Sequence, residues 1–117
     1  HGHALNSVSV AGTTLQTGST NTIPATPPAT FALNFTNTGQ NAETNVVCKV
    51  SAVSSSGTTV TGQQTIPQTG AGQTYTCQVP LRSTPPTGSA QVTATVGAVP
   101  GEKNAANNTL MFPVSFQ

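Results

Sequence analysis

The fold is decided in residues 31–53, which read FALNFTNTGQNAETNVVCKVSAV. Apolar residues alternate with polar or small ones on both sides of the turn-forming triplet 37–39, Asn-Thr-Gly. The alternating apolar residues are Phe31, Leu33 and Phe35 before the triplet, and Val46, Cys48, Val50 and Ala52 after it. A period of two residues is typical of a strand with one buried face. This stretch therefore predicts two β-strands.

The same alternation recurs along the chain, and no window has a helical period. The further apolar sets are Val8 and Val10; Val60; Tyr75, Cys77, Val79 and Leu81; Val92, Ala94, Val96 and Ala98; and Leu110, Phe112, Val114 and Phe116. Turn clusters at 54–57, 70–72 and 85–88 separate them. About seven strands at this spacing predict an all-β, immunoglobulin-like two-sheet sandwich. Pro113 lacks a donor N–H, so we expect it at a sheet edge or a bulge.

Charge is scarce: the 117 residues include five charged side chains, Glu43, Lys49, Arg82, Glu102 and Lys103. A typical soluble domain has about a quarter of its residues charged. A net charge of +1 without a Lys/Arg cluster excludes nucleic acid as a partner. The apolar runs are too short for membrane insertion. Near-neutral surfaces favour association, so the expected partners are copies of the same chain.

The two cysteines, Cys48 and Cys77, each lie in an alternating run. The chain starts at His1 rather than Met, which suggests removal of a secretory signal peptide. An even number of cysteines in a secreted chain predicts one disulfide, which would stabilise the fold by roughly 3 kcal/mol. The alternative is a pair of buried free thiols. The spacing does not decide whether the bond would join two sheets or adjacent strands.

We divide the chain into residues 1–29, an N-terminal strand and Pro/Thr-rich tether, and residues 30–117, the sandwich. A structureless segment near 20 residues is unusual in a compact domain. Residues 11–30 are either a long loop, with a small strand around Leu15 or Ile23, or a tether that lets residues 4–10 pair with a neighbouring subunit. The run Leu110–Phe116 could be exchanged in the same way.

Several short motifs occur in a characteristic order: 37–39 (Asn-Thr-Gly), 70–74 (Gly-Ala-Gly-Gln-Thr), 88–96, 100–102 (Pro-Gly-Glu) and 107–109 (Asn-Asn-Thr). In this order, roughly from residue 30 to 117, the chain resembles the CARDB-type domains, immunoglobulin-like sandwiches of bacterial and archaeal surface and secreted proteins. The resemblance implies a spacer or adhesion module. The cysteine pair, the long segment before Phe31 and the lack of acidic residues near the Asn-Asn turn depart from that family, which argues against an acidic calcium site.

The sequence His1-Gly2-His3 is the most concentrated chemical signal. A free amine, backbone nitrogens and the imidazole of a third-residue histidine match the square-planar nitrogen ligation that Cu(II) and Ni(II) prefer. His1 could instead chelate through its own amine and ring. We therefore expect copper at His1 and His3, the alternative being an uninvolved terminus.

We do not expect enzyme activity, because both histidines are at the terminus, there is no Asp, and the two Glu residues lie in predicted turns. A sugar platform is disfavoured by the absence of Trp. Two triplets, at Asn34 and Asn107, match the N-glycosylation acceptor pattern.

These observations predict a secreted structural subunit of an extracellular filament or surface assembly, joined by strand exchange. The alternatives are a monomeric spacer or adhesion module of a larger secreted protein, and a small extracellular copper-binding protein.

Overall fold

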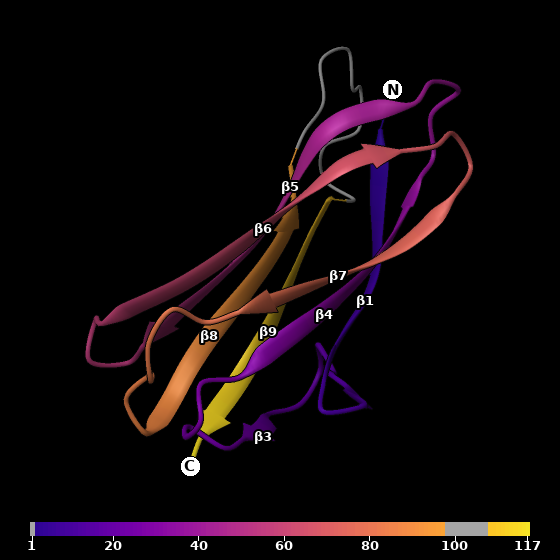
Figure 1. Ribbon diagram of the computed structural model, residues 1–117. Coiled ribbons are helices and arrows are strands. Elements are labelled where there is room, and N and C mark those ends of the chain that lie inside the picture. The colour runs from indigo at the N-terminus through magenta and orange to yellow at the C-terminus, as the bar shows by residue number, and fades with distance from the viewer. Residues whose placement is uncertain (1, 98–107) are drawn as a thin grey trace.

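The computed structural model describes residues 2–97 and 108–117, and these fold into two packed β-sheets (Figure 1). The first sheet has the order β2 (Thr13–Thr14), β1 (His3–Val10), β4 (Thr30–Asn37) and β7 (Thr74–Pro80). The second has the order β3 (Asn21–Ile23), β9 (Thr109–Phe116), β8 (Gly88–Val96), β5 (Glu43–Ser54) and β6 (Thr59–Thr69). All neighbouring strands are antiparallel except β3 and β9, which are parallel. The predicted all-β sandwich is confirmed.

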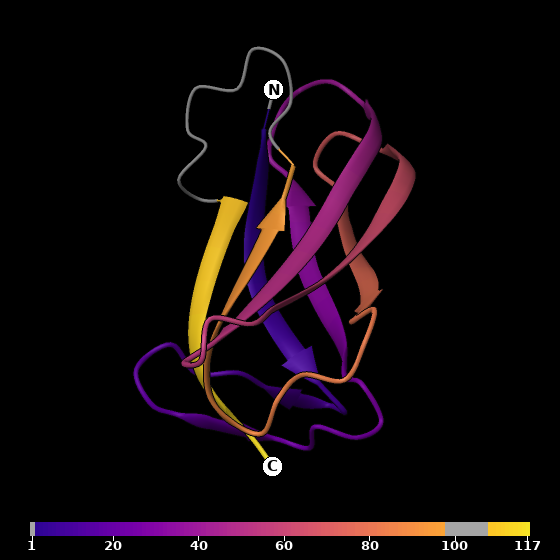
Figure 2. The ribbon, with the colours of Figure 1, turned by 90° about the vertical axis from the view of Figure 1, so that its left-hand side faces the viewer.

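The sandwich is elongated, with principal extents of 42 × 26 × 25 Å. Two views at right angles show that β1 begins at one end of the long axis and that β9 finishes at the opposite end (Figures 1 and 2). Residues 2–97 and 108–117 include no helix that is long and apolar enough to cross a membrane.

The core lies between the sheets and is built from the alternating residues. All four phenylalanines, Phe31, Phe35, Phe112 and Phe116, are at most 2 % exposed. Their polar neighbours in sequence face outward, as the period of two requires. Apolar and polar residues alternate along the strands because each sheet buries one face and leaves the other in water.

β6 is longer than the sequence predicted. Val60 suggested a short strand, but β6 pairs with β5 from Thr59 to Thr69. The polar residues after Val60 carry no apolar alternation, because this half of an edge strand is largely exposed. A side chain at Gly62 would collide with the backbone carbonyl of Pro80, so glycine is needed where β6 passes the end of β7.

The segment 11–29 contains two short strands, β2 and β3, and four buried residues, Leu15, Ile23, Ala25 and Ala29. β2 forms a hairpin with β1, while β3 lies in the other sheet beside β9. The chain thus crosses between the sheets after Leu15. In the structure this segment is packed against the sandwich, because its few apolar residues are buried in the core.

Both sheets have partly open edges. β2 pairs with β1 only at Ser9 and Val10, so the outer side of β1 has no neighbouring strand along most of its length. β3 pairs with β9 only from Val114 onward, which leaves Pro113 on an edge, as its missing N–H predicted.

Candidate functional site

The N-terminal end of β1 is held by a buried polar contact. The side chain of His3 is fully buried, and its Nε2 lies 2.9 Å from Oγ1 of Thr69 on β6. The imidazole meets the ring of Phe35 edge-on, with centroids 5.5 Å apart and planes at 70°. Phe35 in turn stacks on Tyr75 at 5.8 Å. The contact therefore joins the first residues of β1 to both sheets.

Asn37, at the end of β4, completes this buried cluster. Its Nδ2 donates to the carbonyl oxygens of Asn41 (2.9 Å) and Thr69 (3.2 Å), and its Oδ1 accepts from the amide of Gly39 (3.0 Å). A buried amide needs such partners, because an unmade hydrogen bond there is costly. The cluster consists of amide, hydroxyl and imidazole groups, whose contacts fix the start of β1 and the end of β4 against β6.

Of the two predicted copper ligands, the structure describes only His3. His1 lies outside the described residues, and His3 is the buried residue of the cluster. Among residues 2–97 and 108–117 there is no group of three or more His, Cys, Asp or Glu side chains that could hold a metal ion. A metal from solvent reaches the His3 ring only when this end of β1 loosens, and copper binding stays a prediction.

Cys48 on β5 and Cys77 on β7 lie in different sheets, at the centre of the core. They are unbonded in the structure and 2.5 Å apart. Hydrogen bonding to Cys77, together with burial, raises the pKa of the Cys48 thiol well above its ordinary value. The same hydrogen bond lowers the pKa of the Cys77 thiol. The proximity supports the predicted disulfide, which would join the two sheets.

The remaining predicted residues are the charged side chains and the two candidate glycosylation sites, only some of which the structure describes. Glu43 is half-buried, whereas Lys49 and Arg82 are exposed, as expected of solvated charges. Asn34 is half-buried on the outer side of β4, where its Oδ1 accepts from Nδ2 of Asn6 at 3.0 Å. Glu102, Lys103 and Asn107 lie outside the described residues.

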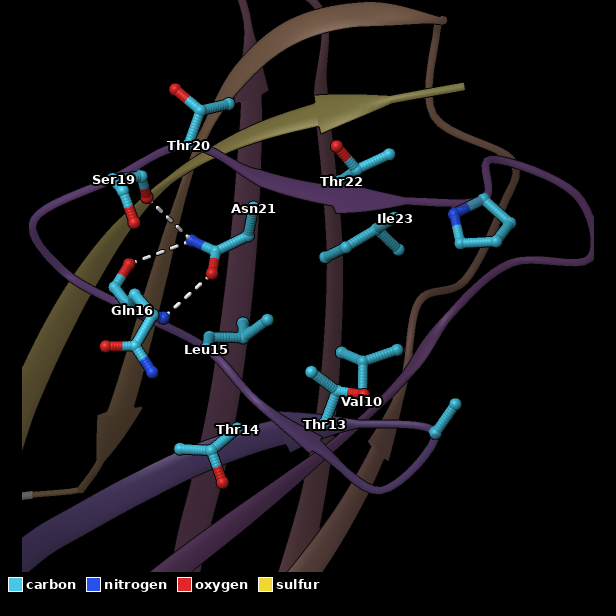
Figure 3. A pocket seen from close by; sticks show the side chains of 12 residues that line it. Val10, Thr13, Thr14, Leu15, Gln16, Ser19, Thr20, Asn21, Thr22 and Ile23 are labelled. Carbon is cyan, nitrogen blue, oxygen red and sulfur yellow. Dashed lines mark hydrogen bonds between the residues drawn. The ribbon is translucent and has the colours of Figure 1, made fainter.

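The crossover between the sheets is a feature that the sequence did not reveal. Asn21, the first residue of β3, binds both backbone groups of Gln16: its Oδ1 accepts from the Gln16 amide (2.7 Å), and its Nδ2 donates to the Gln16 carbonyl (2.8 Å; Figure 3). The same Nδ2 donates to the carbonyls of Ser19 (3.2 Å) and Pro113 (2.9 Å). Asn21 thereby closes the loop 16–20 and ties it to β9.

The loop encloses a cavity of about 450 Å³, lined mainly by threonine, serine and aliphatic side chains of residues 10–24 (Figure 3). Of the two amide side chains that line it, those of Gln16 and Asn21, the second is occupied by the contacts that close the loop. None of the residues that line the cavity is charged. An Asn after a Gly/Ser/Thr stretch signals a turn, but its partners Gln16 and Pro113 could not be inferred without the topology.

On the outer face of the first sheet, Asn6 links β1 to β4. Its Nδ2 donates to Oδ1 of Asn34 and to Oγ1 of Thr36, each at 3.0 Å, and Thr36 lies 2.9 Å from the hydroxyl of Thr74 on β7. The pairing of β1 with β4 shifts register beside Asn6, between Leu5 and Ser7. This register shift places the Asn6 side chain where it can form hydrogen bonds with two residues of β4, Asn34 and Thr36.

Comparison with known proteins identifies the fold. No family model matches the chain, so the resemblance to CARDB-type domains gains no support from that comparison, and no curated protein matches. Among solved structures, the chain is similar to a domain, residues 272–376, of a candidate cell surface protein from Methanosarcina acetivorans, determined by NMR. The TM-score is 0.66 at 19 % identity, over 97 % of this chain and 91 % of that one. At this identity the likeness establishes a shared sandwich fold.

Proposed function

We propose that this protein is a structural subunit of a secreted or cell-surface assembly, in which copies are joined by exchange of the N-terminal strand. The observation that carries the proposal is the position of β1. It lies beside the two-residue edge strand β2, which covers only its last two residues, yet it supplies the buried side chains of His3, Leu5 and Val8 to the core. A strand with these properties can leave one sandwich and complete another without losing its contacts.

The open edges favour association between copies. Proteins usually protect edge strands with lysine, proline or inward-pointing charge. Of the described residues, the charged side chains are Glu43, Lys49 and Arg82, and none of them lies in β1 or β7 of the first sheet. The second sheet is better protected, because β6 and β9 contain Pro67 and Pro113. With a net charge of +1, the chain also has little long-range repulsion to keep copies apart.

Secretion is supported by the cysteine pair, because inter-sheet disulfides persist in oxidising compartments. It is also supported by the similar fold of the domain from the Methanosarcina protein, which is named for the cell surface. Copper outside the cell would reach the N-terminal histidines when β1 leaves its groove in the sandwich.

A disulfide cross-link between β1 of one copy and β4 of another tests whether copies exchange β1. Ala4 on β1 and Thr36 on β4 are paired residues, and two cysteines at such positions can form a disulfide. One chain carries Ala4→Cys and the other Thr36→Cys, and the two are mixed and oxidised. The expected result is a covalent heterodimer. The control pairs Ser9→Cys with Thr36→Cys, which are out of register, and is expected to remain uncross-linked.

Light scattering and negative-stain microscopy of the native material test the assembly itself. Regular polymers are expected. A monodisperse monomer at high concentration, without the Ala4–Thr36 cross-link, would contradict the proposal.

A monomeric spacer or adhesion module is the second candidate, and one observation favours it. In the structure β1 fills the groove of its own sandwich, and the chain enters at one end of the 42 Å axis and leaves at the other (Figure 2). Such a unit adds length when it is joined to other domains. The monomer outcome of the two experiments above would select this function.

A further inference from the structure

If copies exchange β1, the chain needs a hinge, and the crossover between the sheets has the right position for one. β1 and β2 form a hairpin in the first sheet, and Leu15 remains attached to it because its amide donates to the Val8 carbonyl at 2.8 Å. β3 begins at Asn21 in the second sheet. The loop 16–20 is therefore the connection between an exchangeable hairpin and the body of the sandwich.

Most contacts of the hairpin cannot control exchange. The bond from His3 to Thr69 and those from Asn6 to Asn34 and Thr36 join the hairpin to a sandwich. They form equally well with the chain's own sandwich or with that of a neighbour. An interaction shifts an equilibrium only if it differs between the two states, so these contacts leave the ratio of states unchanged.

The bonds between Asn21 and Gln16 do differ between the states. These residues flank the loop, and the side chain of Asn21 meets both backbone groups of Gln16 within 2.8 Å. Such contacts require the loop to fold back on itself. When the loop extends toward a second copy, Gln16 leaves with the hairpin, whereas the Asn21 bond to Pro113 stays with the sandwich.

We propose that the loop 16–20 is the hinge of strand exchange, and that the side chain of Asn21 is the latch that keeps the β1–β2 hairpin on its own sandwich. This inference rests on the proposed function. The occupant of the acceptor groove is the hairpin of a second copy of this chain. Five extended residues span about 17 Å, enough to reach an adjoining copy. Each copy donates one hairpin and accepts another, so successive exchange along a row of copies gives an open filament, whereas mutual exchange between two copies closes a dimer.

The test compares Asn21→Ala with Asn6→Ala. Both remove an amide that makes several hydrogen bonds, but only Asn21 contacts the hinge. Samples of equal concentration are equilibrated, and size-exclusion chromatography with light scattering gives the ratio of exchanged oligomer to monomer. Asn21→Ala is expected to raise this ratio about tenfold, the loss of about two net hydrogen bonds. Asn6→Ala is expected to leave it unchanged.

A second variant covers the case in which Asn21→Ala does not fold. Asn21→Asp retains the acceptor for the Gln16 amide but turns a carboxylate oxygen toward the Gln16, Ser19 and Pro113 carbonyls. Because these oxygens repel one another, this variant should also raise the ratio above that of the wild type. The Ala4–Thr36 cross-link then identifies the oligomers as exchanged.

The failure of this inference can be told from failure of the proposed function. Equal ratios for the Asn21 and Asn6 variants, in a protein that still forms the Ala4–Thr36 cross-link between copies, would overturn the latch and leave strand exchange intact. Absence of any cross-link between copies, in wild type and variants alike, would overturn both.

Discussion

The centre of the sandwich and its N-terminal hairpin are held together by different kinds of contact. At the centre, Cys48, Cys77 and the phenylalanine side chains lie fully between the sheets, where apolar burial dominates. The hairpin also contributes Leu5 and Val8 to the core, but its ends are fixed by side-chain hydrogen bonds of His3, Asn6 and Asn21. From this comparison we expect the centre to determine global stability and the hairpin to open separately.

The largest expected effect is that of Phe31→Ala in β4. Phe31 is fully buried and its ring lies in the core, so its truncation leaves a cavity. We expect a loss of about 3–5 kcal/mol in the free energy of unfolding. Denaturant unfolding followed by circular dichroism measures it. A loss below about 1 kcal/mol would show that the centre does not dominate stability.

Removal of the cysteine pair is expected to have the next largest effect. If the disulfide forms, its reduction costs about 3 kcal/mol, because a long loop is released in the unfolded chain. The double variant Cys48→Ala/Cys77→Ala is the control, since reductant should not change its stability. Mass spectrometry after alkylation of the non-reduced, unfolded protein counts the thiols directly, and two free thiols would contradict the disulfide.

The variant Leu15→Ala tests how much the N-terminal hairpin contributes to stability compared with the centre of the sandwich. Leu15 is 7 % exposed at the end of the hairpin, and we expect a loss of about 2 kcal/mol, at the low end for buried leucine. The matched control, Leu33→Ala, removes a fully buried leucine of β4. Amide hydrogen exchange should accelerate throughout the sandwich for Leu33→Ala, but chiefly in β1 and β2 for Leu15→Ala. Uniform acceleration in both variants would mean that the hairpin does not open separately.

The sequence predicted the centre well because alternation there reports burial directly. The inward faces of β4, β5, β7, β8 and β9 were all indicated by residues such as Phe35, Val50 and Val92, which are fully buried. The long β6 was not indicated, because an exposed edge strand needs no apolar alternation. For the same reason β2 and β3 were suggested only by isolated residues.

The candidate sites were harder to predict, because their contacts join residues far apart in the chain. His3 is a predicted metal ligand because of its position near the terminus, and its contact with Thr69, 66 residues away, could not be predicted in this way. Asn21 lies next to Gln16 in space, but the bond to Pro113 depends on the parallel pairing of β3 with β9. The sequence shows which polar side chains are present, but the strand topology determines their hydrogen-bond partners.

The opposite placement of the two ends has a mechanical consequence. Tension applied between His3 and Phe116 acts nearly along β1 and β9 (Figure 1). The hydrogen bonds of an antiparallel pair lie perpendicular to its strands, so such a pull shears many of them together instead of unzipping them one by one. Bonds loaded together resist rupture collectively, and a chain of these sandwiches would resist stretching even though each contact is weak.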